Sequence, residues 1–78
     1  MFAIVAKADG VPVCRKVEGV TPDPVVTWVS QAKATAFISS KGLDADYQVV
    51  ALTEDSLNRM AQALSRPADD IAFDAYPG

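Results

Sequence analysis

Hydrophobic and polar positions change their period twice between Pro24 and Leu52, the stretch that organises the chain. From Val25 to Val29 two alternating sets of side chains are both largely apolar, which is typical of a strand covered on both faces. The alanine-rich segment that follows predicts a helix, because Ser30 is a good N-cap and Gly42 stands where a helix ends. Asp46 to Leu52 alternates again and is the most apolar strand of the chain, so we expect it at the centre of a sheet.

The predicted helix over residues 31–41 has one apolar face. We expect this face to comprise Ala32, Ala36, Phe37 and Ile38. Gly42 followed by Leu43 predicts a Schellman motif, in which Leu43 packs against Ile38.

A β-hairpin is predicted at the N-terminus, over residues 1–18. Two apolar runs flank Asp9-Gly10, the strongest short signal for a type I′ turn, and this register places Ala6 opposite Val13. Pro12 and nearby charged residues favour a sheet edge for the second strand. The candidate interaction edge consists of Val13, Arg15 and Val17.

The rest of the chain predicts a second helix and a last strand. Thr53 is the expected N-cap of this helix, and Pro67 ends the helix. The apolar stripe of the helix comprises Leu57, Met60, Ala61 and Leu64. Residues 71–76 form a short strand with Ile71, Phe73 and Ala75 on one face.

The predicted fold is therefore α+β, with the order β-β-β-α-β-α-β, in one domain over residues 1–78. An antiparallel hairpin (1–18) joins a βαβαβ unit (24–76) in a mixed sheet, and both helices pack on the sheet. The last strand is expected to be parallel, with antiparallel insertion as the alternative.

Composition limits the classes of function. A chain of 78 residues buries a small core, and its one cysteine, Cys14, excludes an internal disulfide. Oligomerisation is then the remaining source of stability, so a homodimer is expected. The net charge of −3 without a basic cluster excludes phosphate-driven nucleic-acid binding, and no apolar run is long enough to span a membrane. The start lacks a signal peptide, which predicts a cytoplasmic protein. Because the chain begins at a methionine and carries no tag or linker, we expect a complete gene product.

Acidic residues concentrate in the second half of the chain. Residues 1–41 carry five basic and three acidic residues, whereas residues 42–78 carry two basic and seven acidic ones. Spread surface charge is the simpler interpretation, and an acidic face for a basic partner, around Asp69, Asp70 and Asp74, is the alternative.

No catalytic motif is present. The chain has no histidine, and its four glycines are isolated, so neither a serine–histidine arrangement nor a phosphate-binding loop can form. Cys14 is expected to be a plain, half-buried thiol. We therefore predict no catalytic, metal-binding or cofactor-binding residue.

One candidate binding crevice follows from the topology. In open α/β sheets, ligands bind beside the carboxyl ends of parallel strands and the helix N-termini that follow them. The residues expected there are Trp28, Ser30, Thr53, Glu54 and Tyr76. The simpler interpretation makes Trp28 a core residue and Ser30 and Thr53 helix caps.

Residues 24–78 resemble a known family. The run V-V-T-W-V-S-x-x-x-A-x-x-F, the segment from Tyr47 to Thr53 and the closing D-A-Y-P-G are similar to small bacterial domains of the enhanced-serine-sensitivity N-terminal type. The resemblance implies a non-enzymatic interaction module, and it carries over no site residue and excludes the N-terminal hairpin.

Three hypotheses of function remain. The first is a non-enzymatic protein-interaction module, an adaptor, accessory subunit or regulator that forms a homodimer. The second is a phage-type or mobile-element inhibitor that uses the acidic second half. The third is a small-ligand sensor that uses the crevice near Trp28.

Overall fold

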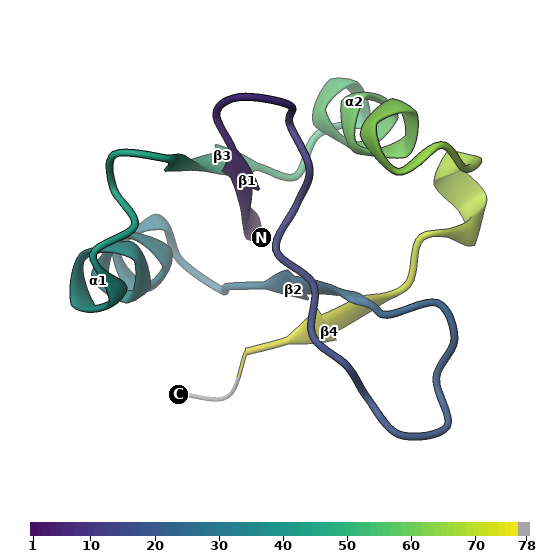
Figure 1. Cartoon of the computed structure of the whole chain (residues 1–78), viewed down its shortest axis with the longest axis horizontal. Helices are drawn as coiled ribbons and strands as arrows, with labels where there is room; N and C mark the ends of the chain where they lie inside the picture. Colours follow the sequence, from purple (N-terminus) through teal and green to yellow (C-terminus); the bar gives the residue numbers. More distant parts are fainter. Residues whose placement is uncertain (77–78) are drawn as a thin grey trace.

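The computed structural model describes residues 1–76. Across these residues the chain forms four strands, two α-helices and one short 3-10 helix (Figure 1). In chain order they are β1 (Phe2–Ala6), β2 (Val25–Thr27), α1 (Gln31–Lys41), β3 (Tyr47–Ala51), α2 (Glu54–Leu64), η1 (Ala68–Asp70) and β4 (Phe73–Ala75). Neither α-helix of the described residues has the length and hydropathy of a membrane span.

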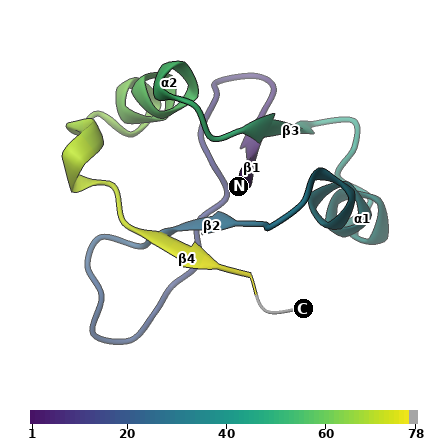
Figure 2. The same cartoon turned by 180° about the vertical axis from the view of Figure 1, so that it is seen from behind.

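In place of the predicted single mixed sheet, the strands form two two-stranded sheets, β1–β3 and β2–β4, which lie side by side in a row in the order β4, β2, β1, β3 (Figures 1 and 2). β1 pairs antiparallel with β3, and β2 pairs parallel with β4. The two ladders meet where Phe2 and Trp28 exchange backbone hydrogen bonds of 2.9 and 2.8 Å. The α+β fold class is confirmed, and the last strand is parallel.

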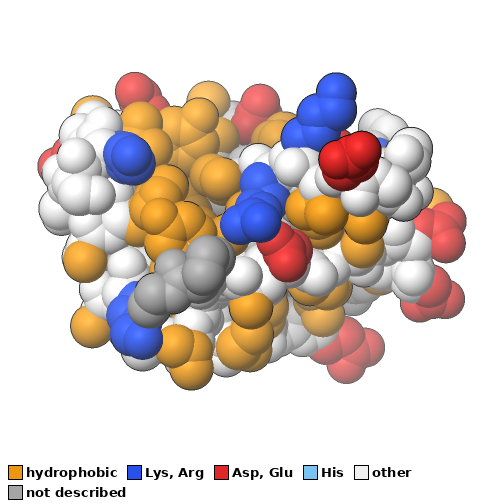
Figure 3. Space-filling view, turned by 90° about the horizontal axis from the view of Figure 1, so that it is seen from below, with side chains coloured by type: hydrophobic (Ala, Val, Ile, Leu, Met, Phe, Trp, Pro, Cys, Tyr) orange, Lys and Arg blue, Asp and Glu red, His pale blue; other side chains and the backbone are white. Residues whose placement is uncertain are grey.

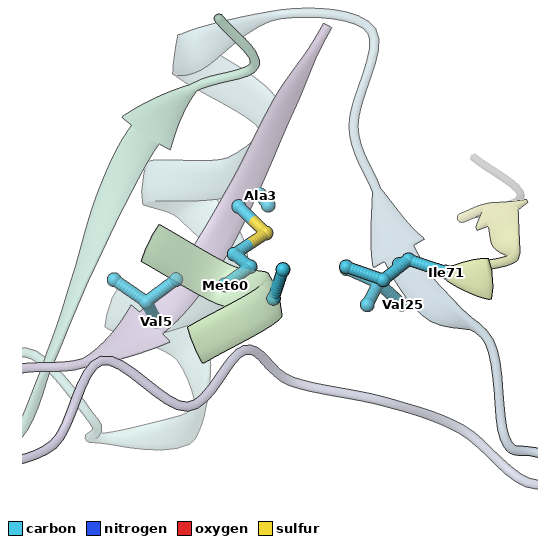
Figure 4. Close-up of a cluster of buried hydrophobic side chains, with 6 residues drawn as sticks. Ala3, Val5, Val25, Met60 and Ile71 are labelled. Atoms are coloured by element: carbon cyan, nitrogen blue, oxygen red, sulfur yellow. The ribbon is translucent and has the colours of Figure 1, made fainter. Parts of the chain in front are cut away.

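β1 is the central strand, because its two faces supply both halves of the core. Ala3 and Val5 pack with Met60 of α2 and with Val25 and Ile71, as Figure 4 shows. Ile4 faces the other way, into a cluster with the α1 side. The two helices therefore cover opposite faces of the row of strands.

The second cluster contains Ile4, Val26, Trp28, Ala34 and Ile38. Val25 and Val26 thus point to opposite faces, as their alternation predicts.

β3 is an edge strand, so its predicted central position is wrong. It pairs with β1 on one side, and its side chains are half-buried or exposed. The apolar alternation of β3 could not distinguish the two positions, because half-burial beneath α1 needs the same residues as a central strand.

The predicted hairpin register is also wrong. Ala6 N–H donates to Val11 C=O, and Val13 N–H donates to Ile4 C=O, so the pairing is shifted from the predicted one. Gly10 takes a positive φ of 76°, but Asp9 is not among the described residues with positive φ, as a type I′ turn would require. Lys7 instead bonds to Asp46 C=O beside β3, which extends the loop.

Both helices begin at their predicted caps. Ser30 Oγ accepts from Lys33 N–H at 3.2 Å, and Leu43 N–H donates to Ile38 C=O at 3.0 Å beyond Gly42, which confirms the Schellman motif. At α2, Thr53 and Ser56 form a capping box.

The predicted buried face of α1 needs correction. Ala34 and Ile38 are buried, Phe37 is half-buried, and Ala32 and Ala36 are exposed. Alanines stand on several sides of this helix, so their pattern could not identify the packed face. In α2 the predicted stripe is correct, with Met60 and Ala61 buried and Leu57 and Leu64 half-buried.

β4 is shorter than the predicted strand, since it covers only Phe73–Ala75 and Ile71 is the C-cap of η1. Ile71 is buried, whereas Phe73 is 43% exposed and Ala75 is exposed. These residues therefore do not share one buried face.

Candidate functional site

The predicted crevice does not form as one site. Trp28 and Tyr76 lie together, with ring centroids 5.4 Å apart, but Thr53 and Glu54 lie beyond β1 at the other end of the row. The reason is the position of β1, since Phe2 pairs with Ala51 on one side and with Trp28 on the other. β1 therefore separates the carboxyl ends of β2 and β3.

Ser30 and Thr53 act as helix caps. The Ser30 hydroxyl accepts from Lys33 N–H, and the Thr53 hydroxyl accepts from Ser56 N–H at 3.1 Å. These bonds occupy groups that a ligand would need. The simpler interpretation of both residues agrees with this geometry.

An aromatic groove remains at the Trp28 end. Trp28, Phe37 and Tyr76 form a cluster in which each pair of ring centroids is separated by 5.2 to 5.4 Å. The open hollow beside it has a volume of about 360 Å³. Its lining residues are Trp28, Lys33, Ala36, Phe37, Ser40 and Tyr76. Figure 3, which views the molecule from below, shows apolar side chains gathered on that face with basic and acidic side chains among them.

The indole N–H of Trp28 is buried and finds no acceptor within residues 1–76. Trp28 itself is 2% exposed, and Tyr76 stacks on its ring. A buried donor without a partner costs free energy, on the order of 1–3 kcal/mol. This donor is the unusual polar feature of the groove.

Sequence reasoning missed Phe37 and Lys33 as groove residues. The sequence places Phe37 on the apolar face of the helix, and its half-buried ring lies 5.2 Å, centroid to centroid, from the rings of both Trp28 and Tyr76. Lys41 Nζ lies 5.8 Å from the Phe37 ring centroid, a cation–π distance. The spacing of Lys33, Phe37 and Lys41, four residues apart on one helix, was the available signal.

A second hollow, of about 170 Å³, lies between the β1–β3 pair and α2. Val5, Val50, Ser56, Arg59 and Met60 contribute to its walls. It is smaller than a usual ligand pocket of about 300–1,000 Å³. We assign it no ligand.

The predicted interaction edge at Val13, Arg15 and Val17 is not a free sheet edge. Val13 donates to Ile4 and accepts from Val26, and Arg15 N–H donates to Pro24 C=O. This segment lies between β1 and β2, so its backbone groups are used within the chain. Val17 lies past it in a turn, where its C=O accepts from Val20 N–H.

Arg15 and Asp74 form an ion pair across this region, with Nε 2.8 Å from Oδ2. Asp74 is therefore not available in the same way as Asp69 and Asp70, which are exposed in η1. The acidic face proposed from the three aspartates is reduced to two free carboxylates.

The outer side of β3 is a free edge. Lys7 N–H bonds to Asp46 C=O, and Leu52 N–H bonds to Met1 C=O. Successive residues of an antiparallel strand direct their backbone N–H and C=O groups alternately to its two sides. The backbone groups of Gln48 and Val50 therefore point toward β1. Those of Tyr47, Val49 and Ala51 point outward.

Each end of this edge is closed by the chain itself. Tyr47 N–H donates to Leu43 C=O at 3.0 Å, and Ala51 C=O accepts from the Ser56 hydroxyl at 2.7 Å. Within residues 1–76, the outward groups between these ends have no backbone hydrogen-bond partner. They are Tyr47 C=O, Val49 N–H, Val49 C=O and Ala51 N–H.

Cys14 is a half-buried thiol, and its Sγ lies 3.6 Å from Pro12 C=O. Burial raises the pKa of this thiol, Asp23 raises it further, and Arg66 lowers it by less. The thiolate is disfavoured, so Cys14 is a poor nucleophile at neutral pH. Within residues 1–76, no three potential metal ligands of the His, Cys, Asp and Glu types lie together.

Comparisons of the chain with protein-family models, with curated proteins and with solved structures find no match. The resemblance to enhanced-serine-sensitivity N-terminal domains therefore stays a prediction.

Proposed function

We propose that this chain is a small non-enzymatic protein-interaction module that pairs through the outer edge of β3 with an extended segment of a partner. The supporting observation is the run of outward backbone donors and acceptors from Tyr47 to Ala51. Strand addition at an edge draws its affinity from such groups. A cytoplasmic location is part of the proposal, because a lone reduced thiol such as Cys14 is normal there.

The β3 edge carries none of the usual protection against pairing. Natural edges are blocked by charged side chains, proline, bulges or very short strands. β3 has five residues, YQVVA, with neither charge nor proline. By contrast, β4 has three residues, one of which is Asp74. The unprotected edge is therefore the one that favours a partner.

The non-enzymatic part of the proposal rests on the chemistry of the side chains. The chain has no histidine, and the raised pKa of Cys14 keeps its thiol protonated. Ser30, Thr53 and Ser56 have hydroxyls engaged in helix capping. None of these groups is positioned as an activated nucleophile.

Proline at position 49 tests the proposal. Val49 N–H points outward, so Val49→Pro removes an edge donor without removing a β1–β3 hydrogen bond. The control, Val49→Ile, keeps the N–H and the β-branched side chain. Native mass spectrometry of the gently purified full chain should show assemblies that V49I retains and V49P loses. Assemblies of equal abundance in both variants would contradict the proposal.

A small-ligand sensor is the second candidate, favoured by the aromatic groove and the buried Trp28 N–H. The groove combines apolar ring faces with Lys33, which fits a planar organic anion. Benzoate is a suitable probe, and its titration should quench Trp28 fluorescence in the native chain and more weakly in Lys33→Ala. Fluorescence that does not respond to benzoate in either protein would remove the groove as a site for this class of ligand.

A further inference from the structure

The four free groups of the β3 edge form a set that matches itself. Two of them are donors, Val49 N–H and Ala51 N–H, and two are acceptors, Tyr47 C=O and Val49 C=O. They are arranged symmetrically about Val49. An edge of this kind can meet a second copy of itself by a two-fold rotation, as isologous interfaces require.

We propose that the partner of β3 is the β3 strand of a second copy of this chain, paired antiparallel about a two-fold axis at Val49. This inference rests on the proposed function and names its partner. In an antiparallel pair, directly opposed residues alternate between exchanging two hydrogen bonds and exchanging none. Val49 opposite its own copy forms an exchanging pair, which uses both of its outward groups.

The next exchanging position places Tyr47 opposite Ala51 of the second copy. There Ala51 N–H donates to Tyr47 C=O, and the symmetric bond forms on the other side of the axis. The groups left facing each other are Tyr47 N–H and Ala51 C=O, which are already bonded to Leu43 and Ser56 within each chain. All four free groups of each copy are thereby satisfied.

Neighbouring registers satisfy fewer groups. If Val49 is placed opposite Tyr47 of the second copy, Val49 C=O faces a Tyr47 N–H that is already bonded to Leu43. If Val49 is placed opposite Ala51, Val49 N–H faces an Ala51 C=O that already accepts from Ser56. Each shift loses half of the matched bonds, so the bonds within the chain select the register centred on Val49.

The side chains of β3 are compatible with this pairing. The opposed pairs are Val49 with Val49, Gln48 with Val50, and Tyr47 with Ala51, and none of these residues carries a charged side chain. No like-charge contact opposes the strand itself, and β-branched pairs stabilise neighbouring strands. The two-fold axis keeps both α1 helices on one face of the joined sheet and both α2 helices on the other.

Amide hydrogen exchange of the native chain, followed by NMR at increasing protein concentration, tests this register. Exchange at Val49 and Ala51 should slow as sedimentation shows the dimer forming. Gln48 and Val50 face β1 within each copy and are already protected in dilute protein, so they serve as internal controls whose protection should rise less with concentration than that of Val49 and Ala51. The variant V49P should dimerise at least about tenfold more weakly than V49I, because it loses two bonds of the symmetric set.

Three results would overturn the inference. A dimer in which Val49 and Ala51 exchange as fast as in dilute protein would place the interface elsewhere, and slowed exchange at Phe73 and Ala75 would place it at β4. A chain that stays monomeric at every concentration would exclude the second copy as partner. If the chain stays monomeric, a complex with another protein that V49P abolishes would still support the proposed function. A complex that V49P does not affect would contradict both the self-pairing and the proposed function.

Discussion

At the scale of single residues, Cys14 shows how burial decides the chemistry of a side chain. Arg15 and Lys16 adjoin the thiol in sequence, but desolvation is the main influence on it, and the raised pKa follows from that burial. Position in the strand predicted this outcome, because neighbours in an extended segment point to opposite faces.

The pH dependence of stability follows from this residue. The pKa of Cys14 is higher in the folded chain, so the folded state holds its proton at a pH where the unfolded state has released it. The contribution of the protonated Cys14 thiol to stability is fully present below the pKa of the unfolded chain, about 8.5. It is lost as the pH rises through the pKa of the folded chain. Urea unfolding should show that the free energy of unfolding declines from pH 7 to pH 10, and that Cys14→Ala reduces this decline. An equal decline in C14A would contradict the assignment.

Arg15 provides a second prediction at this scale, since its ion pair with Asp74 joins the segment after the first loop to β4. Both side chains are partly exposed, so Arg15→Ala should lower the free energy of unfolding by about 0.5–1 kcal/mol. The exposed pair of Arg59 and Asp55 within α2 is the control, and Arg59→Ala should cost less. Chemical denaturation of both variants measures this, and a larger loss for R59A would contradict it.

At the scale of elements, sequence predicted what depends on near neighbours. Ser30, Gly42 and Thr53 act within one helical turn, so their roles could be read directly and are confirmed. The register of β1 depends on residues more than forty positions away, where it pairs with β3. Alternation marks a strand but does not name its neighbour, which is why the hairpin register and the central position of β3 were wrong and the predicted crevice did not form.

Gly42 tests the local part of this account. It has a φ of 66°, and a Cβ built there meets nothing within 4 Å, so substitution is resisted by backbone strain alone. Gly42→Ala should cost about 1 kcal/mol, and Gly42→Asn should cost less because Asn tolerates this conformation. Thermal unfolding of the two variants separates these effects, and equal costs for both would show that strain is not the cause.

At the scale of the whole molecule, the core is divided between two faces, and neither half is large. Met60 is 1% exposed and joins α2 to β1 on one face, while Ile38 joins α1 to the sheet on the other. A chain of this size buries only about 60–65% of its unfolded surface. The proposed association through β3 would extend the sheet and add to the stability of the single chain.

This dependence has a thermal consequence. A dimer that forms only from folded chains raises the midpoint of unfolding as protein concentration increases. The native chain should therefore unfold at a higher temperature when concentrated, whereas the midpoint of V49P should change little. Calorimetry over a hundredfold range of protein concentration measures how the unfolding midpoint of each protein changes. An equal change in the native chain and in V49P would contradict the prediction.

The central claim is that β3 pairs with a strand outside its own chain, and that this strand is another β3. Isotope-filtered NOE spectroscopy on an equal mixture of labelled and unlabelled chains tests it most directly. The account predicts contacts between the α-protons of Gln48 in one copy and Val50 in the other, the closest position of the proposed register. Intermolecular contacts confined to β4 or to the groove around Tyr76, with none from β3, would contradict it.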